Sequence, residues 1–444
     1  MTFVDVSSVN AFIPGQVKLD EHETRMIEQR DRLLGPAYRL MYQKPLHFVR
    51  GEGVWLYDPD GRRYLDTYNN VVSLGHCHPD VVEAITKQVA TLCTNTRYLH
   101  ETILELADGL LSTVSGDLSH MMLTGSGSEA NDLAYRIAQV RTGGTGVIIT
   151  ETAYHGITDA VSKFSPTLGE GVPMGAHVRT VTAPAAYRTG PNVGERFTRD
   201  VEAAIADLKR HGIRPAMLIV DSIFTSDGIL PEEPGFLKGA VEAIRKAGGL
   251  FIADEVQPGF GRTGGNMWGF QRHGIDPDIV TLGKPMGNGQ PIAGLLTRHD
   301  VVEEFGRNSR YFNTFAGNAV SCAAAAAVLK VIKRDRIMDN ARDVGAYLLE
   351  KVEGLRGRHE CLGNVRGAGL FVAADIVTDR ETQTSDRVRT TKVVNEMREN
   401  GVLISACGID HNILKIRPPL IFTRENVDLF TDVLDKALEV SADR

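Results

Sequence analysis

Short apolar runs alternate with helical stretches between about residues 118 and 300 of the chain. The apolar runs predict buried strands at residues 120–123, 146–150, 217–221, 250–254, 279–282 and 292–296. Helices are expected between them, for example at residues 128–141 and 200–209. On the second of these, one face carries Val201, Ala204, Ile205 and Leu208. This alternation predicts an α/β fold with a mostly parallel central sheet, helices on both faces and right-handed crossovers.

The flanking segments have different patterns. Residues 1–45 are mixed and polar, with an amphipathic stretch at 21–34, and residues 54–65 hold two apolar runs around Asp-Pro-Asp-Gly, a hairpin signal. From about residue 320 we expect a helix at 321–333, strands at 370–374 and 413–416, and a last helix at 424–440 with Thr423 as its N-cap. The predicted organisation is an arm and hairpin (1–69) that pack with the small domain, a large domain (70–318) and a small α+β domain (319–444).

Composition narrows the class of protein. The 444 residues are 42% hydrophobic and 24% charged, which is typical of a globular protein. A net charge of −7 argues against a nucleic-acid or anionic-membrane partner. The five cysteines are scattered, which favours a reducing compartment, and the first residues lack the pattern of a signal peptide. We therefore expect a cytoplasmic protein.

Two charged residues follow or end predicted strands. Lys284 lies in the Gly- and Pro-rich segment TLGKPMGNGQPIAG, and Asp254 ends the strand at 250–254. Taken alone, either residue is more often a solvated loop charge. Ligands of open α/β sheets, however, bind beyond the carboxyl ends of the strands, so we expect both residues at one crevice. Pyridoxal 5'-phosphate needs a lysine for its imine and a carboxylate that keeps its pyridine nitrogen protonated, and this pair supplies both.

Other segments offer binding groups for such a cofactor. The strand at 120–123 runs through Thr-Gly-Ser-Gly-Ser into a helix, whose first N–H groups and dipole suit a phosphate. Many such turns only cap a helix, and this one is neither a Walker loop nor a GxGxxG turn. Tyr154 and His155 follow the strand at 146–150 and can present a flat ring to the crevice. Thr314 in YFNTFAGN can add a hydroxyl to the phosphate site.

Five segments occur in an order and spacing that resembles the class III aminotransferases of fold type I: SGSEAN, YHG, DEVQ, GKP and NTFAGN. The resemblance covers roughly residues 40–440. It implies an aspartate-aminotransferase-like fold, a homodimer or dimer of dimers with active sites at the subunit interface, and pyridoxal phosphate as the cofactor. It also implies that Lys284 holds the cofactor as a Schiff base and then serves as the base and acid of a proton shift.

The same resemblance implies roles for the other residues of these segments. Asp254 would pair with the pyridinium nitrogen of the cofactor, and Gln257 would hydrogen-bond the ring hydroxyl. Val256 would pack on one face of the ring, and Tyr154 would stack on the other face with His155 beside it. The phosphate would be held by Ser126, Gly127 and Ser128, and Thr314 would reach the phosphate of the neighbouring subunit's cofactor.

The expected substrate site rests on weaker matches. Asn70, in YNNVVSLGHCHP, resembles a residue at the mouth of the family's active site. In NILKIRPPL, Lys415 aligns with the arginine that holds a substrate carboxylate in many relatives, and Arg417 lies two residues on. Residues two apart on a strand share a face, so either side chain can project inward. Asp221-Ser222 stands where relatives commonly have Glu followed by Pro or Ser, and we interpret it as structural.

The segment Gly-His-Cys-His-Pro at 75–79 has the composition of a metal site. Its His and Cys side chains are spaced too tightly to ligate one ion comfortably, and the sequence has no partner cluster, so no metal is expected. A non-catalytic regulatory protein is also disfavoured, because Lys284 is present and no DNA-binding segment is attached.

The expected reaction is transfer of an amino group from an amine, ω-amino acid or amino acid to a 2-oxo acid (pyruvate, 2-oxoglutarate or glyoxylate) by a ping-pong mechanism. The segments NNV, GHCHP, NTRYLHE, FTSDGIL and GKPMGNGQP are similar to a branch that contains alanine–glyoxylate-aminotransferase-2-like enzymes and phospholyases. Elimination of phosphate from a phosphorylated amino alcohol is therefore the rival hypothesis. A racemase on the same scaffold is a smaller alternative.

Overall fold

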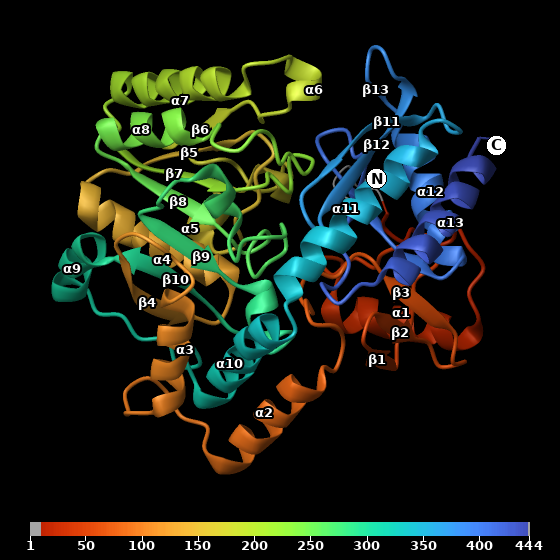
Figure 1. The fold of residues 1–444 in the computed structure, drawn as a ribbon, viewed down its shortest axis with the longest axis horizontal. Coiled ribbons are helices and arrows are strands. Elements are labelled where there is room, and N and C mark those ends of the chain that lie inside the picture. The colour runs from red at the N-terminus through yellow and green to blue at the C-terminus, as the bar shows by residue number, and fades with distance from the viewer. Residues whose placement is uncertain (1–9, 443–444) are drawn as a thin grey trace.

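The computed structural model describes residues 10–442, which form three β-sheets and the helices around them (Figure 1). The largest sheet and its helices make up one side of the molecule in this view. The two smaller sheets lie on the other side, together with the N-terminal helix and the last three helices of the chain.

The largest sheet has seven strands in the order β4-β10-β9-β8-β7-β5-β6. They are β4 (Leu118–Thr124), β5 (Gly146–Thr150), β6 (Val178–Val181), β7 (Pro215–Asp221), β8 (Leu250–Asp254), β9 (Ile279–Leu282) and β10 (Ala293–Arg298). Strands β5 to β9 are parallel, and β10 is antiparallel to both of its neighbours. The predicted fold class is confirmed. The sequence prediction missed β6, an edge strand in which only the two end residues are buried.

Helices cover both faces of this sheet. On one face, α4 (Gly127–Thr142) packs on a core that includes Val147 and Met217. The next residues of the same strands, Ile148 and Leu218, point into a second core that α7 (Val193–Arg210) and α8 (Lys238–Lys246) close. Successive side chains of a strand point to opposite faces, so both must be apolar when both faces are covered. This explains the continuous apolar runs in the sequence.

The remaining helices of this part are short or peripheral. They are α2 (Pro79–Thr91), α3 (Glu101–Leu111), α5 (Asp159–Ser162), α6 (Ala186–Thr189) and α9 (His299–Asn308), with 3₁₀ turns at Pro166–Leu168 (η1), Gly269–His273 (η2) and Lys284–Gly287 (η3). Among residues 10–442, no helix combines the length and the apolar character that a membrane crossing requires.

The C-terminal part is an antiparallel sheet packed with long helices. The sheet order is β11 (Leu362–Gly367), β12 (Val372–Asp379), β16 (Ile413–Ile416) and β15 (Ser405–Cys407), and β13 (Thr384–Ser385) pairs with β12. The helices are α11 (Ile337–Leu355), α12 (Arg387–Glu399) and α13 (Arg424–Val440). Helix α10 (Ala319–Arg334) leads into this part and packs against α2 and α3 (Figure 1). Thr423 caps α13 as predicted, because its side chain accepts a hydrogen bond from the Asn426 N–H at 3.3 Å.

The third sheet joins two segments that lie far apart in the sequence. Its order is β1 (Arg50–Glu52), β2 (Trp55–Tyr57), β3 (Arg63–Asp66) and β14 (Val402–Leu403). The predicted hairpin is the antiparallel pair β2 and β3, whereas β14 runs parallel to β3. The N-terminal hairpin therefore shares a sheet with residues near the C-terminus. The domain boundaries at residues 69 and 318 stay a prediction.

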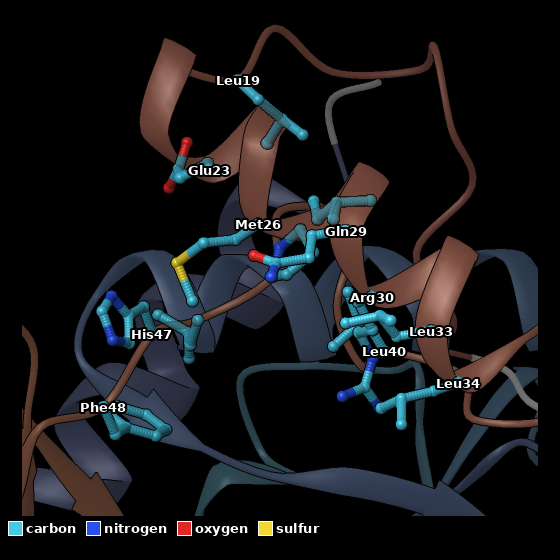
Figure 2. A pocket seen from close by; sticks show the side chains of 13 residues that line it. Leu19, Glu23, Met26, Gln29, Arg30, Leu33, Leu34, Leu40, His47 and Phe48 are labelled. Atoms are coloured by element: carbon cyan, nitrogen blue, oxygen red, sulfur yellow. The ribbon is translucent and has the colours of Figure 1, made fainter.

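Helix α1 (Glu21–Leu34) coincides with the predicted amphipathic stretch. An apolar cleft of about 430 Å³ lies between α1 and residues 40–48 (Figure 2). Met26 and Leu33 line it from α1, facing the segment that carries Leu40 and Phe48. The cleft shares no lining residue with the cavity around Lys284 described below.

Candidate active site

Lys284 and Asp254 line one cavity of about 190 Å³ at the carboxyl ends of the parallel strands. Asp254 is the last residue of β8, and Lys284 starts η3 directly after the neighbouring strand β9. The expectation that these two residues share a crevice is therefore met. In open α/β sheets this edge is where ligands bind.

Lys284 is held in an unusual environment. Its backbone φ of 39° lies in the left-handed region, where a non-glycine residue carries about 1–3 kcal/mol of strain. Its Nζ has no hydrogen bond or ion pair among residues 10–442 and lies 6.0 Å from the centroid of the Tyr154 ring. Burial, and next the charge of Arg417, lower the pKa of Lys284 to about 8. Near neutral pH this amine can therefore lose its proton and act as a nucleophile or base.

Asp254 is oriented by three donors. His155 Nδ1 lies 2.7 Å from its Oδ2, Asn131 Nδ2 donates to the same oxygen at 3.0 Å, and the Val256 N–H donates to Oδ1 at 3.1 Å. Because a carboxylate only accepts hydrogen bonds, the Nδ1 of His155 carries the proton. The family resemblance implied that His155 lies beside Tyr154 at the cofactor ring. In the structure its ring is buried and paired with Asp254, so it supports the carboxylate.

Asn131 is a site residue that the sequence analysis did not assign. It lies in SGSEAN, three residues after Ser128 on α4, and both line the cavity. Residues three apart on a helix share a face, which is the signal that could have identified it. Its Nδ2 also donates to the His155 carbonyl oxygen at 2.7 Å. Asn131 thus fixes both members of the His155–Asp254 pair.

The N-terminus of α4 opens toward the cavity, which Gly127 and Ser128 line. A Cβ atom on Gly127 would lie 3.1 Å from the Val256 side chain, so a larger residue would press on the cavity wall. Ser128 Oγ accepts a hydrogen bond from the Ile157 N–H at 3.1 Å. Ser126 caps the helix, accepting from the Glu129 N–H at 3.3 Å, and does not line the cavity. The free N–H groups here suit an anion such as a phosphate.

Tyr154, Val256 and Gln257 line the same cavity, as their assigned roles require. Gln257 has a partner that the sequence did not predict, because its Oε1 accepts a hydrogen bond from Arg417. Thr314 lies outside the cavity, on the exposed surface of this chain. Thr314 is expected to act in the site of a second subunit, and the structure contains one chain, so this role stays a prediction.

The three residues expected at the substrate site, Asn70, Lys415 and Arg417, lie near the cavity but outside its lining. Asn70 is buried, and its Nδ2 donates to the Gln257 carbonyl oxygen at 2.9 Å. Arg417 is 7% exposed and donates from Nε to the Tyr68 carbonyl oxygen at 2.8 Å. None of the three, Lys415 included, lines the 190 Å³ cavity itself.

Lys415, on β16, is the least satisfied of these groups. Its side chain is buried, with 9% of the residue exposed, and has no hydrogen bond or ion pair among residues 10–442. Burial and the nearby Arg417 lower its pKa to about 7, and Lys284 acts in the same direction. A buried ammonium without a counter-ion is costly, so this position is suited to an anionic group of a ligand.

His76, in the segment considered for a metal, has a different partner: its Nε2 lies 2.8 Å from Asp66 Oδ2. In the part of the chain that the structure describes, residues 10–442, no group of three His, Cys, Asp or Glu side chains could hold a metal ion.

Glu255 follows Asp254 but serves the fold. It is fully buried, and its carboxylate accepts hydrogen bonds from Ser222 Oγ at 2.6 Å, the Gly269 N–H at 2.7 Å and the Phe270 N–H at 2.9 Å. The two acidic neighbours therefore separate into one that faces the cavity and one that ties η2 to β8.

Replacing Glu255 with glutamine is expected to lower the free energy of unfolding at pH 7 by about 1 kcal/mol, because the amide nitrogen cannot accept from the converging N–H donors. The loss stays small because burial raises the pKa of Glu255 to about 7, so ionising the native side chain is itself costly at this pH. Thermal unfolding measures the loss. Ser222→Ala removes one donor and leaves the carboxylate intact, so its effect should be smaller. An unchanged melting temperature for Glu255→Gln would contradict the structural role.

Comparisons with known proteins identify the same family that the sequence motifs resemble. The family model described as "Aminotransferase class-III" matches residues 39–438. "Alanine--glyoxylate aminotransferase 2-like" from Drosophila melanogaster is 39% identical over 424 residues, which cover 92% of this chain and 85% of that protein. "Ethanolamine-phosphate phospho-lyase homolog 1" from Caenorhabditis elegans is 34% identical, with 93% of each chain covered.

The similar solved structures likewise include a phospholyase and an aminotransferase. A phospholyase from Arthrobacter in complex with phosphoethanolamine has 42% sequence identity and a TM-score of 0.90, covering 93% of this chain and 99% of that chain. An aminotransferase from Bacillus anthracis has 27% identity and a TM-score of 0.87, covering 95% of this chain and 100% of that chain.

Proposed function

Because the chain belongs to the class III aminotransferase family, we propose that it moves an amino group from a small amine, ω-amino acid or amino acid to a 2-oxo acid such as pyruvate, 2-oxoglutarate or glyoxylate. The proposed order is ping-pong, with Lys284 as the central residue. The observation that supports this most directly is the single cavity that Lys284 and Asp254 share.

The residues of the cavity fit pyridoxal phosphate, the cofactor of this family. The Lys284 amine has no partner among residues 10–442, Asp254 is fixed by His155 and Asn131, and the start of α4 offers free N–H groups beside Gly127. Lys284 would bond the cofactor, Asp254 would face its ring nitrogen and α4 would bind its phosphate. When bound, this cofactor supplies an electron sink that stabilises negative charge next to the substrate nitrogen.

The chain's own residues would then orient the reactants and move protons. Lys284 Nζ, with its pKa lowered to about 8, can accept and return a proton near neutral pH. Asp254 would hold a proton on the ring nitrogen, and its hydrogen bonds to His155 and Asn131 keep it aimed. Tyr154 would cover one ring face and Val256 the other. We further propose a cytoplasmic homodimer or dimer of dimers, in which Thr314 reaches the site of the second subunit.

Lys415 is proposed to bind the anionic group of the substrate. Lys415→Met is expected to raise KM for anionic substrates about 10–100-fold with a smaller change in kcat, because one charge-assisted hydrogen bond is lost. In the wild type, KM should rise as pH increases through about 7, since the ammonium that attracts the anion loses its proton there.

Steady-state kinetics between pH 6 and 9 would measure both effects. Lys436→Met, at an exposed position of α13, is the matched control and should behave as the wild type. Lys415→Arg keeps the charge in a different shape, so it should retain more of the affinity than Lys415→Met. An unchanged KM in Lys415→Met would exclude Lys415 from the substrate site.

Phosphate elimination from a phosphorylated amino alcohol is the second candidate. It is favoured by the likeness to the Arthrobacter phospholyase and by the chemistry of Lys415, a compact point charge that suits a phosphate, where arginine would form a bidentate carboxylate clamp. The same cavity can serve both reactions, which differ in the bond that breaks after a proton leaves the substrate carbon.

One experiment separates the two. The holoenzyme is incubated with a panel of amines, ω-amino acids and phosphoethanolamine, with and without each 2-oxo acid. Turnover that requires a 2-oxo acid and yields the matching amino acid supports the aminotransferase. Release of inorganic phosphate without any acceptor would instead establish elimination and overturn the primary proposal.

A further inference from the structure

The cavity wall carries a second carboxylate, Asp221, which the sequence analysis interpreted as structural. Asp221 is the last residue of β7 and is paired in register with Asp254 on the neighbouring parallel strand β8. Such partners lie on strands about 4.8 Å apart and project to the same face. Both acidic residues line the cavity that contains Lys284.

The two carboxylates have different partners. Asp254 is bonded to His155 and Asn131, as described above. Asp221 accepts hydrogen bonds from two backbone N–H groups, those of Ile223 at 3.0 Å and Thr225 at 3.2 Å. These two bonds fix Asp221 at the carboxyl end of β7 and leave acceptor positions on its oxygens free for a cation.

Two buried ammonium groups beside this wall lack a counter-ion. Neither Lys284 nor Lys415 has an ion-pair partner among residues 10–442. The negative charge of Asp221 raises the pKa of both lysines, against the lowering effects of burial and of Arg417. Asp254 also raises the pKa of Lys284, but it is already bonded to His155 and Asn131, so Asp221 adds a second negative charge on the same wall. Burial, and also the charge of Asp254, raise the pKa of Asp221, so its ionised form is favoured by a cation nearby.

We infer that Asp221 is a positioning residue of the site, a second buried carboxylate that supplies counter-charge to the ammonium groups of Lys284 and Lys415 and leaves Asp254 to the cofactor ring nitrogen. The inference rests on the proposed function only in requiring the cofactor at Lys284. It does not depend on whether transfer or elimination follows.

The inference makes the proton on Lys284 Nζ depend on Asp221. The titratable or charged groups that face this nitrogen come from several elements: Tyr154, His155, Asp221, Asp254, Lys415 and Arg417. Removing one negative charge from this set should make the nitrogen lose its proton at lower pH, by about one pH unit.

The test is a spectroscopic pH titration of the holoenzyme, in which the absorbance of the bound cofactor reports the protonation of Lys284 Nζ. Asp221→Asn should move the midpoint to lower pH by about one unit relative to the wild type. The asparagine Oδ1 can still accept one of the two backbone N–H groups, so the turn after β7 is retained. Should this variant fail to fold, Asp221→Ser removes the same charge and keeps a hydroxyl acceptor.

Two further variants separate charge from structure. Asp221→Glu keeps the charge, and its midpoint should stay within a few tenths of a unit of the wild type. Asp227→Asn is the matched control: Asp227 lies in the same loop, accepts from Thr150 Oγ1 at 2.8 Å and does not line the cavity, so its midpoint should not move.

A wild-type midpoint in Asp221→Asn or Asp221→Ser, or an equal shift in Asp227→Asn, would overturn the inference. The readout needs only bound cofactor, so it is separate from the proposed reaction. A wild-type holoenzyme that binds cofactor and transfers no amino group would contradict the proposed function and leave this titration intact.

Discussion

Lys284→Ala is expected to reduce turnover by at least about 10⁴-fold, the largest effect of any single substitution in this chain. The variant loses both the amine that bonds the cofactor and the group that moves a proton. No second amine lines the 190 Å³ cavity, because Lys284 is the only lysine among its lining residues. Alanine also removes the side chain without filling the space, so the cofactor should still bind through α4 and Asp254.

Two measurements check this prediction. Borohydride treatment followed by mass spectrometry should trap the cofactor on the wild-type peptide that contains Lys284 and leave the Lys284→Ala protein unlabelled. Single-turnover kinetics should show the loss of the chemical step. Lys246→Ala, at the exposed end of α8, is the control and should retain full activity and labelling. Label on another lysine would contradict the assignment.

Asp254→Asn is expected to lower kcat by roughly 10²–10³-fold, because it removes a fixed charge aimed at the cofactor ring. Asparagine can still accept from the Val256 N–H through Oδ1, but its Nδ2 then faces the donors of His155 and Asn131, so the variant loses the charge together with the hydrogen bonds that fix it. Cofactor affinity should fall less than kcat, since Lys284 and α4 are unchanged.

Steady-state kinetics and a cofactor-binding titration on the same preparation would test this. Asp278→Asn is a useful contrast: Asp278 is also buried, but it pairs with Arg245 and Arg298 and lies outside the cavity. That variant should lose thermal stability and retain the kcat of its folded fraction. Equal losses of kcat in both variants would mean that Asp254 acts only through folding.

Much of the large sheet could be predicted from sequence because its strands are buried on both faces. Runs such as Gly146–Thr150 and Leu250–Asp254 are apolar at nearly every position, and this pattern is distinctive. The strand β6 was missed because it is short and at the edge, with two of its four residues not buried. The antiparallel direction of β10 could not be predicted, since chain direction leaves no trace in local hydrophobicity.

The candidate site also contains residues that the sequence predicted and contacts that it could not predict. Lys284 and Asp254 could be identified because Asp254 ends a predicted strand, Lys284 comes just after another, and one cofactor requires both side chains. The pairing of His155 with Asp254 depends on residues 99 positions apart, which local pattern does not encode. The same limit applies to Arg417 and Gln257, whose hydrogen bond joins positions 160 residues apart. The place of Asp221 on the cavity wall could not be predicted, because its register with Asp254 appears only once the sheet is assembled.

The parallel pairing of β14 with β3 has a consequence for biosynthesis. A ribosome makes the N-terminal hairpin first, but residues 402–403 emerge only when nearly the whole polypeptide has been translated. Until then the free edge of β3 is open to pairing with another nascent chain. Stop codons placed before residue 402 should therefore yield products that aggregate, even when the complete seven-stranded sheet has been translated.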